Sequence, residues 1–187
     1  MFNKHSIACI LGLTKPEPVE KPWVDALRFQ LTLDNNKLRE HLICAMFNHT
    51  ATNGYTGQPD GIAEDGTLLD VKTGPGIWFP DGGNSIHQKL DWECLVAEYC
   101  KKDGLPVYVA KVPVSCIYEE LCAHAQESLK KGWRFSPYAD WKIWVTKPEV
   151  KIIFKRPDHY PTTPSRGDTV KRFTIIDQLQ YESELIK

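Results

Sequence analysis

Residues 57–74, GQPDGIAEDGTLLDVKTG, constrain the fold more than any other part of the chain. The segment has the pattern of a β-hairpin, in which an Asp-Gly turn separates two short arms. Each arm carries an aspartate, Asp60 and Asp70, where a hairpin ordinarily has an apolar residue. Lys72 follows the second aspartate at a spacing of two, so the two side chains lie on one face of their strand.

The length of the turn decides whether the two aspartates meet. With a two-residue Asp65-Gly66 turn, Asp60 is opposite Val71, and the two carboxylates lie on opposite faces of the hairpin. With a three-residue turn at residues 64–66, in which the glycine adopts the left-handed conformation, Asp60 faces Asp70. Only the longer turn brings the carboxylates together into a possible site.

We predict the three-residue turn, because it also places Ala63, Leu69 and Val71 together on the other face, toward a core. Two facing carboxylates repel each other unless a cation lies between them, and their hard oxygen atoms favour Mg²⁺ or Mn²⁺. Lys72 beside such an ion can orient an attacking water, which suits hydrolysis of a phosphodiester. The alternative is that Asp60 belongs to a solvated Pro-Asp-Gly turn and that Asp70 and Lys72 lie on the solvent-exposed face of an edge strand, with no site.

The residues Pro59, Asp60, Asp70 and Lys72 form the pattern P-D-x₉-D-x-K, which resembles the signature of the PD-(D/E)XK nuclease superfamily. The continuation to Gly74, D-V-K-T-G, resembles the RecB-like and phage exonuclease-like branch. The resemblance covers about residues 38–114. It implies an α/β fold with a restriction-endonuclease-like core, a mixed central β-sheet flanked by helices.

The resemblance also implies roles for individual residues. Asp60, Asp70 and the carbonyl of Val71 are expected to hold Mg²⁺, for which Mn²⁺ can substitute, and Lys72 is expected to position the water. Families of this kind carry an acidic residue on the helix before the hairpin, a position that Glu40 matches.

Two further assignments rest on the same resemblance. His41, rather than its neighbour Glu40, is the alternative ligand from that helix. A glutamine on a helix after the hairpin is typical of the branch, and Gln88 is expected to take that part, although the loop between Lys72 and Gln88 is long for the family.

The expected function is a Mg²⁺-dependent deoxyribonuclease, an exonuclease or DNA-processing enzyme of phage or recombination type. A type II restriction endonuclease is the first alternative. The second is a catalytically inactive DNA-binding subunit of the same fold. We expect a cytoplasmic protein, or a phage protein in the host cytoplasm, that acts on DNA, with a homo-oligomer or a partner subunit possible. No apolar run is long enough for a membrane span.

Charge is distributed unevenly although the formal net charge is −1. Residues 130–172 carry 11 Lys and Arg against 4 Asp and Glu. Basic and aromatic side chains alternate in this segment, a pattern that can neutralise phosphates and stack on bases. The alternative is that its tryptophans are core residues of a strand. The predicted DNA-binding residues are Lys130, Lys131, Arg134 and Lys142.

We predict one domain, with a core at about residues 24–131 and a basic C-terminal extension at about 132–187. Residues 1–21 are expected to form a loose arm or a short strand. Helices are expected at 24–48 with a break at 34–36, at about 84–102, at 116–131 and within 175–185; strands are expected at 106–114, 141–146 and 150–155; and residues 159–169 are expected to form a loop.

The six cysteines are expected to be reduced thiols. No C-x₂-C pair occurs, and the two C-x₅-C pairs do not share a helix face, so neither a zinc site nor an iron–sulfur cluster is predicted from the cysteines. The histidines show no metal-ligand spacing among themselves.

Overall fold

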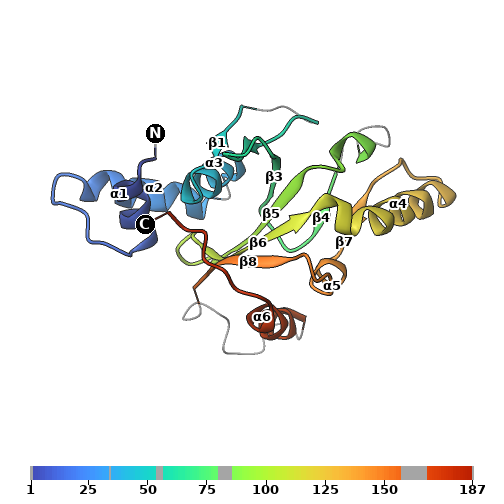
Figure 1. Ribbon diagram of the computed structural model, residues 1–187. Helices are drawn as coiled ribbons and strands as arrows, with labels where there is room; N and C mark the ends of the chain where they lie inside the picture. The colour runs from blue at the N-terminus through green and yellow to red at the C-terminus, as the bar shows by residue number, and fades with distance from the viewer. Residues whose placement is uncertain (1, 34, 54–56, 80–85, 157–167, 187) are drawn as a thin grey trace.

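Six strands form one mixed β-sheet in the part of the chain that the computed structural model describes, namely residues 2–33, 35–53, 57–79, 86–156 and 168–186 (Figure 1). Its order is β1-β2-β3-β5-β6-β8, with β3 and β5 parallel and every other neighbouring pair antiparallel. The chain is therefore a mixed α/β protein. The strands are β1 (Thr50–Ala51), β2 (Gly61–Ile62), β3 (Leu68–Lys72), β5 (Glu93–Tyr99), β6 (Pro106–Pro113) and β8 (Lys151–Lys155).

Strand β5 corrects the prediction of a long helix over residues 84–102. The structure has only a short 3₁₀ helix, η1 (Ile86–Lys89), before the strand. The run Cys94–Ala97 is buried on both faces of the sheet, so it is apolar at every position and lacks the alternation that marks a strand with one wet face. The predicted strand at 106–114 is confirmed as β6.

Three helices precede the sheet: α1 (Lys4–Leu11), α2 (Lys21–Thr32) and α3 (Asn36–Met46). The expected break between two helices is confirmed, because the side chain of Asn35 accepts the N–H of Leu38 and begins α3. The expected loose arm at the N-terminus is wrong in its first half. Asn3 and Ser6 form a reciprocal capping box there that begins α1.

Two apolar cores lie on opposite faces of the sheet. Helices α1–α3 pack on one face, over side chains such as Leu69, Val71 and Leu95. The other face, which includes Cys94 and Val96, is covered by η1, α4 (Val114–Lys130), α5 (Trp141–Trp144) and α6 (Asp168–Gln178). Figure 1 shows α1 and α2 at one end of the molecule and α4 at the other.

The segment after residue 131 contributes to the sheet as well as to its cover. It supplies β8, the edge strand that pairs with β6, and β7 (Tyr138–Ala139), which pairs with β4 (Ile77–Trp78) in a small second sheet. The expected strand at 150–155 is confirmed, but the expected strand at 141–146 is wrong. Asp140 caps a helical turn there, and Trp141 and Trp144 are core residues of α5.

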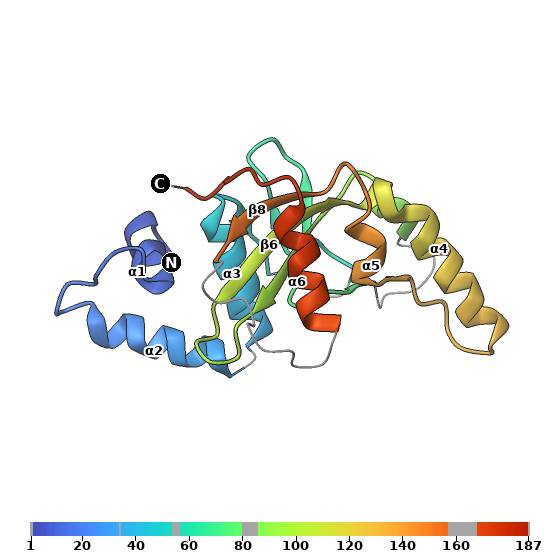
Figure 2. The same ribbon diagram turned by 90° about the horizontal axis from the view of Figure 1, so that it is seen from below.

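The last part of the chain lies against the sheet. Figure 2 shows α6 across the strands β6 and β8. The helix expected within residues 175–185 is confirmed only for its start, since α6 ends at Gln178 and the main chain then runs beside β8. The loop expected at 159–169 lies almost wholly outside the described residues. All six cysteines are free, and no helix of the described residues is long and apolar enough to cross a membrane.

A buried ion pair fastens α6 to the sheet. Arg172, which is buried, donates to both carboxylate oxygens of Glu98, at 2.9 and 2.6 Å. We expect Glu98→Gln to lower the free energy of unfolding by about 2 kcal/mol, because the guanidinium loses its counter-charge and one acceptor. Urea denaturation measures the change. Glu182→Gln is the matched control, since its pair with Lys151 is exposed, and equal stability of the two variants would contradict the prediction.

Candidate active site at the β2–β3 hairpin

The hairpin has the register that brings the two aspartates together. Strand β2 pairs with β3 through Gly61 opposite Leu69 and Ile62 opposite Leu68. Asp60 lies just beyond the last pair, where its N–H donates to the carbonyl of Leu69 at 2.8 Å and its side chain lies against β3 beside Asp70. The prediction of a three-residue turn is therefore confirmed.

The turn itself explains this register. The N–H of Ala63 donates to Thr67 at 2.9 Å, which closes the hairpin around residues 64–66. The N–H of Gly66 donates back to the carbonyl of Ala63 at 3.0 Å, and Gly66 has a φ of 89°. The side chain of Asp65 accepts the N–H of Thr67 at 2.9 Å. Local hydrogen bonds and one left-handed glycine thus set the alignment of both arms.

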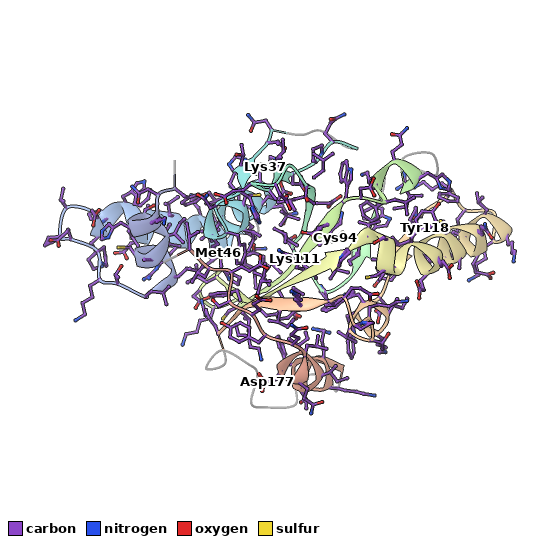
Figure 3. The ribbon with its side chains drawn as sticks, viewed as in Figure 1. Lys37, Met46, Cys94, Lys111, Tyr118 and Asp177 are labelled. Atoms are coloured by element: carbon purple, nitrogen blue, oxygen red, sulfur yellow. The ribbon has the colours of Figure 1, made fainter. Side chains whose placement is uncertain are left out.

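The two faces of the hairpin divide as predicted. Leu69 and Val71 are buried against α1–α3, and Ala63 packs against the same core. Asp70 and Lys72 alternate with them along β3, so their side chains point to the other face. Cys94, labelled in Figure 3, is the β5 residue opposite Asp70 and belongs to that second face.

Asp70 and Lys72 form a close ion pair inside the protein. Lys72 Nζ lies 2.6 Å from Asp70 Oδ1, and the two side chains are only 16% and 10% exposed, respectively. Burial raises the pKa of Asp70 above its usual value, an effect that Lys72 partly offsets. Burial alone would lower the pKa of Lys72, but the Asp70 carboxylate raises it. Lys72 therefore stays an ammonium group next to a carboxylate.

Asp60 is held at the point where the two strands separate. Its Oδ2 accepts the N–H of Val71 at 2.9 Å. The N–H and C=O of one strand residue point to the same edge, so the Val71 carbonyl is directed to the side of β3 where Asp60 lies. Burial raises the pKa of Asp60, and the Glu40 carboxylate adds to the rise. Two side-chain carboxylates and one main-chain carbonyl are thus available at this edge.

Helix α3 places a second acidic group and a lysine beside Asp60. Lys37 Nζ lies 3.0 Å from Glu40 and 3.8 Å from Asp60, so one ammonium group bridges the two carboxylates. Exposure rises from 10% for Asp70 to 42% for Lys37, which shows that the site opens toward α3. Figure 3 shows Lys37 at the surface where α3 and the first strands meet.

Two lysines that were not assigned to the site lie beside its carboxylates. The pair of Lys37 with Glu40 follows from their spacing on one helix, whereas the approach of Lys37 to Asp60 and of Lys89, on η1, to Asp70 was not predicted. The Lys89 side chain is buried, and its charge lowers the pKa of Asp70, partly offsetting the effect of burial. Lys89 Nζ lies 4.9 Å from the ring centre of Phe79, and Lys72 Nζ lies 4.6 Å from the same ring. Two lysine side chains next to Asp70 therefore lie over the same aromatic ring.

The structure places Gln88 differently from what the resemblance implies. Gln88 lies on the exposed side of η1, and its neighbour Lys89 points inward. Within the described residues Gln88 lies on the short 3₁₀ helix η1 and not on an α-helix, and β5 begins four residues after η1 ends at Lys89. The sequence offers only weak signals for Lys89: its position next to Gln88 and its place before the buried Trp92.

The predicted DNA-binding residues are exposed but are not gathered at the hairpin. Lys130 ends α4 and Lys131 follows it, and both lie within 4.0 Å of Glu127. In Figures 1 and 2 the last turn of α4 lies at the outer end of the molecule, away from β3. Arg134 follows in the next loop, and Lys142 lies on α5.

His41 faces another part of the protein. It lines a cavity of about 990 Å³ between the N-terminal helices and β1, and neither Asp60 nor Asp70 lines this cavity. The Nε2 atom of His41 is buried there without a hydrogen-bond partner among the described residues. The structure therefore groups Glu40, and not His41, with the aspartates. Other side chains that line the cavity include Phe2, Trp23, Leu27 and His49.

The donor set at the hairpin suits a hard divalent cation. It offers carboxylate and carbonyl oxygens, the ligands that Mg²⁺ and Mn²⁺ prefer. In the protein chain alone, the ammonium groups of Lys37 and Lys72 supply the positive charge that these carboxylates need. Among the described residues, the oxygens of Glu40, Asp60 and Asp70 do not all lie within 4.8 Å of one another. One ion bound by all three would therefore require side chains to move.

Comparison with models of known protein families finds no match for this chain, and comparison with curated protein sequences finds no significant match. Any functional conclusion therefore depends on the site itself.

Proposed function

We propose that the protein is a Mg²⁺-dependent deoxyribonuclease with a restriction-endonuclease-like core. The observation that carries the proposal is the geometry of the hairpin, in which the Asp60 carboxylate lies against β3 beside Asp70 and Lys72 contacts Asp70. The order of elements supports it as well: a helix that carries Glu40 precedes the hairpin, and the strand with D-x-K lies inside a mixed sheet.

Asp60, Asp70 and the Val71 carbonyl would hold the metal, and Glu40 would complete the set from α3. A bound Mg²⁺ supplies Lewis acidity to the scissile phosphate and lowers the pKa of a bound water. The protein fixes these donors before substrate arrives. The Val71 N–H orients Asp60, and strand pairing on both sides of β3 orients Asp70.

Three lysines would position the water and contact the phosphate. Lys72 stays protonated beside Asp70, and its ammonium group can hydrogen-bond the attacking water or a phosphate oxygen. Lys89 adds positive charge from the covered side of the site. Lys37 lies at the open side, where it can contact an entering phosphate once substrate displaces it from Glu40 and Asp60.

DNA is the proposed substrate, on the strength of the D-x-K-T-G resemblance. We favour an exonuclease or DNA-processing enzyme over a restriction endonuclease for the same reason. An inactive DNA-binding subunit is the second candidate. The sequence argues against it, because Asp60, Asp70 and Lys72 all carry side chains that are competent for the chemistry.

The test is cleavage of linear, nicked and closed circular DNA by the full chain in Mg²⁺, with EDTA as the control. Degradation of linear DNA with sparing of closed circles would support an exonuclease. Cutting of closed circles into discrete fragments would support the restriction endonuclease. Binding of DNA with no cleavage of any form in Mg²⁺ or Mn²⁺ would overturn the enzyme and leave the DNA-binding subunit.

A pair of neighbouring substitutions tests which residue of η1 serves the site. We expect Lys89→Met to lower the cleavage rate about 10-fold, because it removes a charge near Asp70 and keeps an unbranched side chain beside the rings of Phe79 and Trp92. Gln88→Ala, at an exposed position, should change the rate less than about 2-fold. Single-turnover kinetics measure both. A larger loss of rate in Gln88→Ala than in Lys89→Met would show that Gln88 serves the site, as the resemblance implies.

A further inference from the structure

Three metal-ligating side chains converge at the start of the chain, in a part of the fold that the hairpin site does not use. His5 Nε2, Cys9 Sγ and a carboxylate oxygen of Glu20 all lie within 4.8 Å of one another. His5 Nε2 is 3.0 Å from Glu20 Oε2 and 3.6 Å from Cys9 Sγ. Among the described residues, no other group of three His, Cys, Asp or Glu side chains meets this distance.

The local fold explains the convergence. His5 and Cys9 are one turn apart on α1, so they share a face of that helix. Glu20 comes from the turn before α2, where its Oε2 also accepts the N–H of Glu17 at 2.9 Å. The spacing H-x₃-C was therefore a sequence signal for this group. This signal appears only when histidines and cysteines are considered together, because neither the spacing between cysteines nor the spacing between histidines shows it.

One of the three distances equals an edge of a tetrahedron around zinc, a second is shorter than its edge, and the third, between Cys9 and Glu20, is within 4.8 Å. Usual Zn–N, Zn–S and Zn–O bond lengths give edges of about 3.6 Å between nitrogen and sulfur and about 3.4 Å between nitrogen and oxygen. The observed 3.6 Å between His5 and Cys9 matches the first edge. The 3.0 Å hydrogen bond between His5 and Glu20 is shorter than the second edge, and would lengthen slightly when the metal replaces the shared proton.

We propose that His5, Cys9 and Glu20 bind Zn²⁺. A mixed nitrogen, sulfur and oxygen set with a thiolate suits zinc and disfavours Mg²⁺. Binding releases the Cys9 thiol proton to solvent. The Thr14 hydroxyl lies 3.4 Å from Cys9 Sγ and can donate to the thiolate.

The fourth position faces solvent. The Cys9 side chain is buried, with 1% exposed, whereas the His5 side chain is 52% exposed. The open position therefore lies on the His5 side and takes water. His5 and Cys9 lie on α1 and Glu20 lies at the start of α2, so a bound metal would link the two helices. The site does not depend on nuclease activity.

The test uses Co²⁺ and Zn²⁺ with the metal-free full chain, in an excess of Mg²⁺ that occupies oxygen sites. One equivalent of Co²⁺ should give a sulfur-to-cobalt charge-transfer band and intense visible bands of tetrahedral cobalt, both abolished by Zn²⁺. Cys9→Ser should remove the charge-transfer band and weaken Zn²⁺ binding at least about 100-fold. Cys122→Ser, at a half-exposed cysteine of α4, should change neither.

Glu20→Gln gives a second arm that does not disturb a buried residue. It should weaken Zn²⁺ binding about 10-fold to 100-fold and should reduce the rise in melting temperature that Zn²⁺ produces in the unaltered protein. Lack of stoichiometric Zn²⁺ binding by the unaltered protein would overturn the proposal. Retention of the cobalt charge-transfer band in Cys9→Ser would also overturn it, because another cysteine would then be the ligand.

Discussion

Asp70→Asn is expected to lower the rate of Mg²⁺-dependent DNA cleavage at least about 10³-fold, a loss of about 4 kcal/mol of transition-state stabilisation. The substitution preserves shape, removes the negative charge and replaces one carboxylate oxygen with an NH₂ group that cannot ligate a cation. Asp70 is buried, lies beside Asp60 in the hairpin and contacts Lys72.

The matched control lies in the same hairpin. Asp65→Asn changes an exposed aspartate of the turn whose acceptor role toward the N–H of Thr67 an asparagine oxygen can keep. This variant should cleave DNA at the rate of the unaltered protein. Lys72→Ala should lose about 10²-fold or more, since it removes the group proposed to position water or phosphate. Thermal unfolding of each variant checks that the fold is retained.

These variants also distinguish cleavage by this protein from cleavage by a contaminating nuclease. Cleavage by Asp70→Asn within about 10-fold of the unaltered rate would show that the hairpin is not the catalytic centre. DNA affinity should change far less than rate in Asp70→Asn, because phosphate contacts supply most of the binding. A parallel loss of affinity and rate would instead indicate a binding surface.

Features with local causes were predictable from the sequence. The hairpin register follows from the turn residues 64–66 and from alternation along β3, both of which lie within a few residues of the site. The break between α2 and α3 follows from the cap at Asn35. Asp60, Asp70 and Lys72 were found because the same short segment carries all three.

Features that depend on distant packing were missed. Lys37 lies near Asp60 and Lys89 lies near Asp70 because α3, which precedes the hairpin in the sequence, and η1, which follows it, both pack beside the hairpin. Strand β5 was predicted as a helix because burial on both faces removes its periodicity. The group of His5, Cys9 and Glu20 needs two helices to meet, although the spacing of its first two members was visible.

Gly104→Ala is expected to lower the free energy of unfolding by about 3 kcal/mol, from two additive causes. Gly104 lies in the turn between β5 and β6 with a φ of 70°, a conformation that costs other residues about 1 kcal/mol or more. A Cβ atom would also lie 2.5 Å from main-chain atoms of Leu31 and Thr32 at the end of α2. Main chain cannot rotate away as a flexible side chain can, so the turn and the helix would have to separate.

Gly132→Ala isolates the first cause from the second. Gly132 has a φ of 76°, and a Cβ there would meet nothing within 4 Å. It should therefore show only the conformational cost, about 1 kcal/mol, in urea denaturation at an unchanged m-value. The difference between the variants measures how closely the β5–β6 turn abuts α2.

That contact bears on the site through α3. The Leu31 carbonyl, which a Cβ at Gly104 would crowd, also accepts both hydrogen bonds from Arg39, next to Glu40 on α3. Separation of the turn from α2 should therefore move Glu40, so Gly104→Ala should lower cleavage even under conditions where the variant is fully folded. Equal stability and equal activity of the two glycine variants would show that α2 and α3 are not held by this turn.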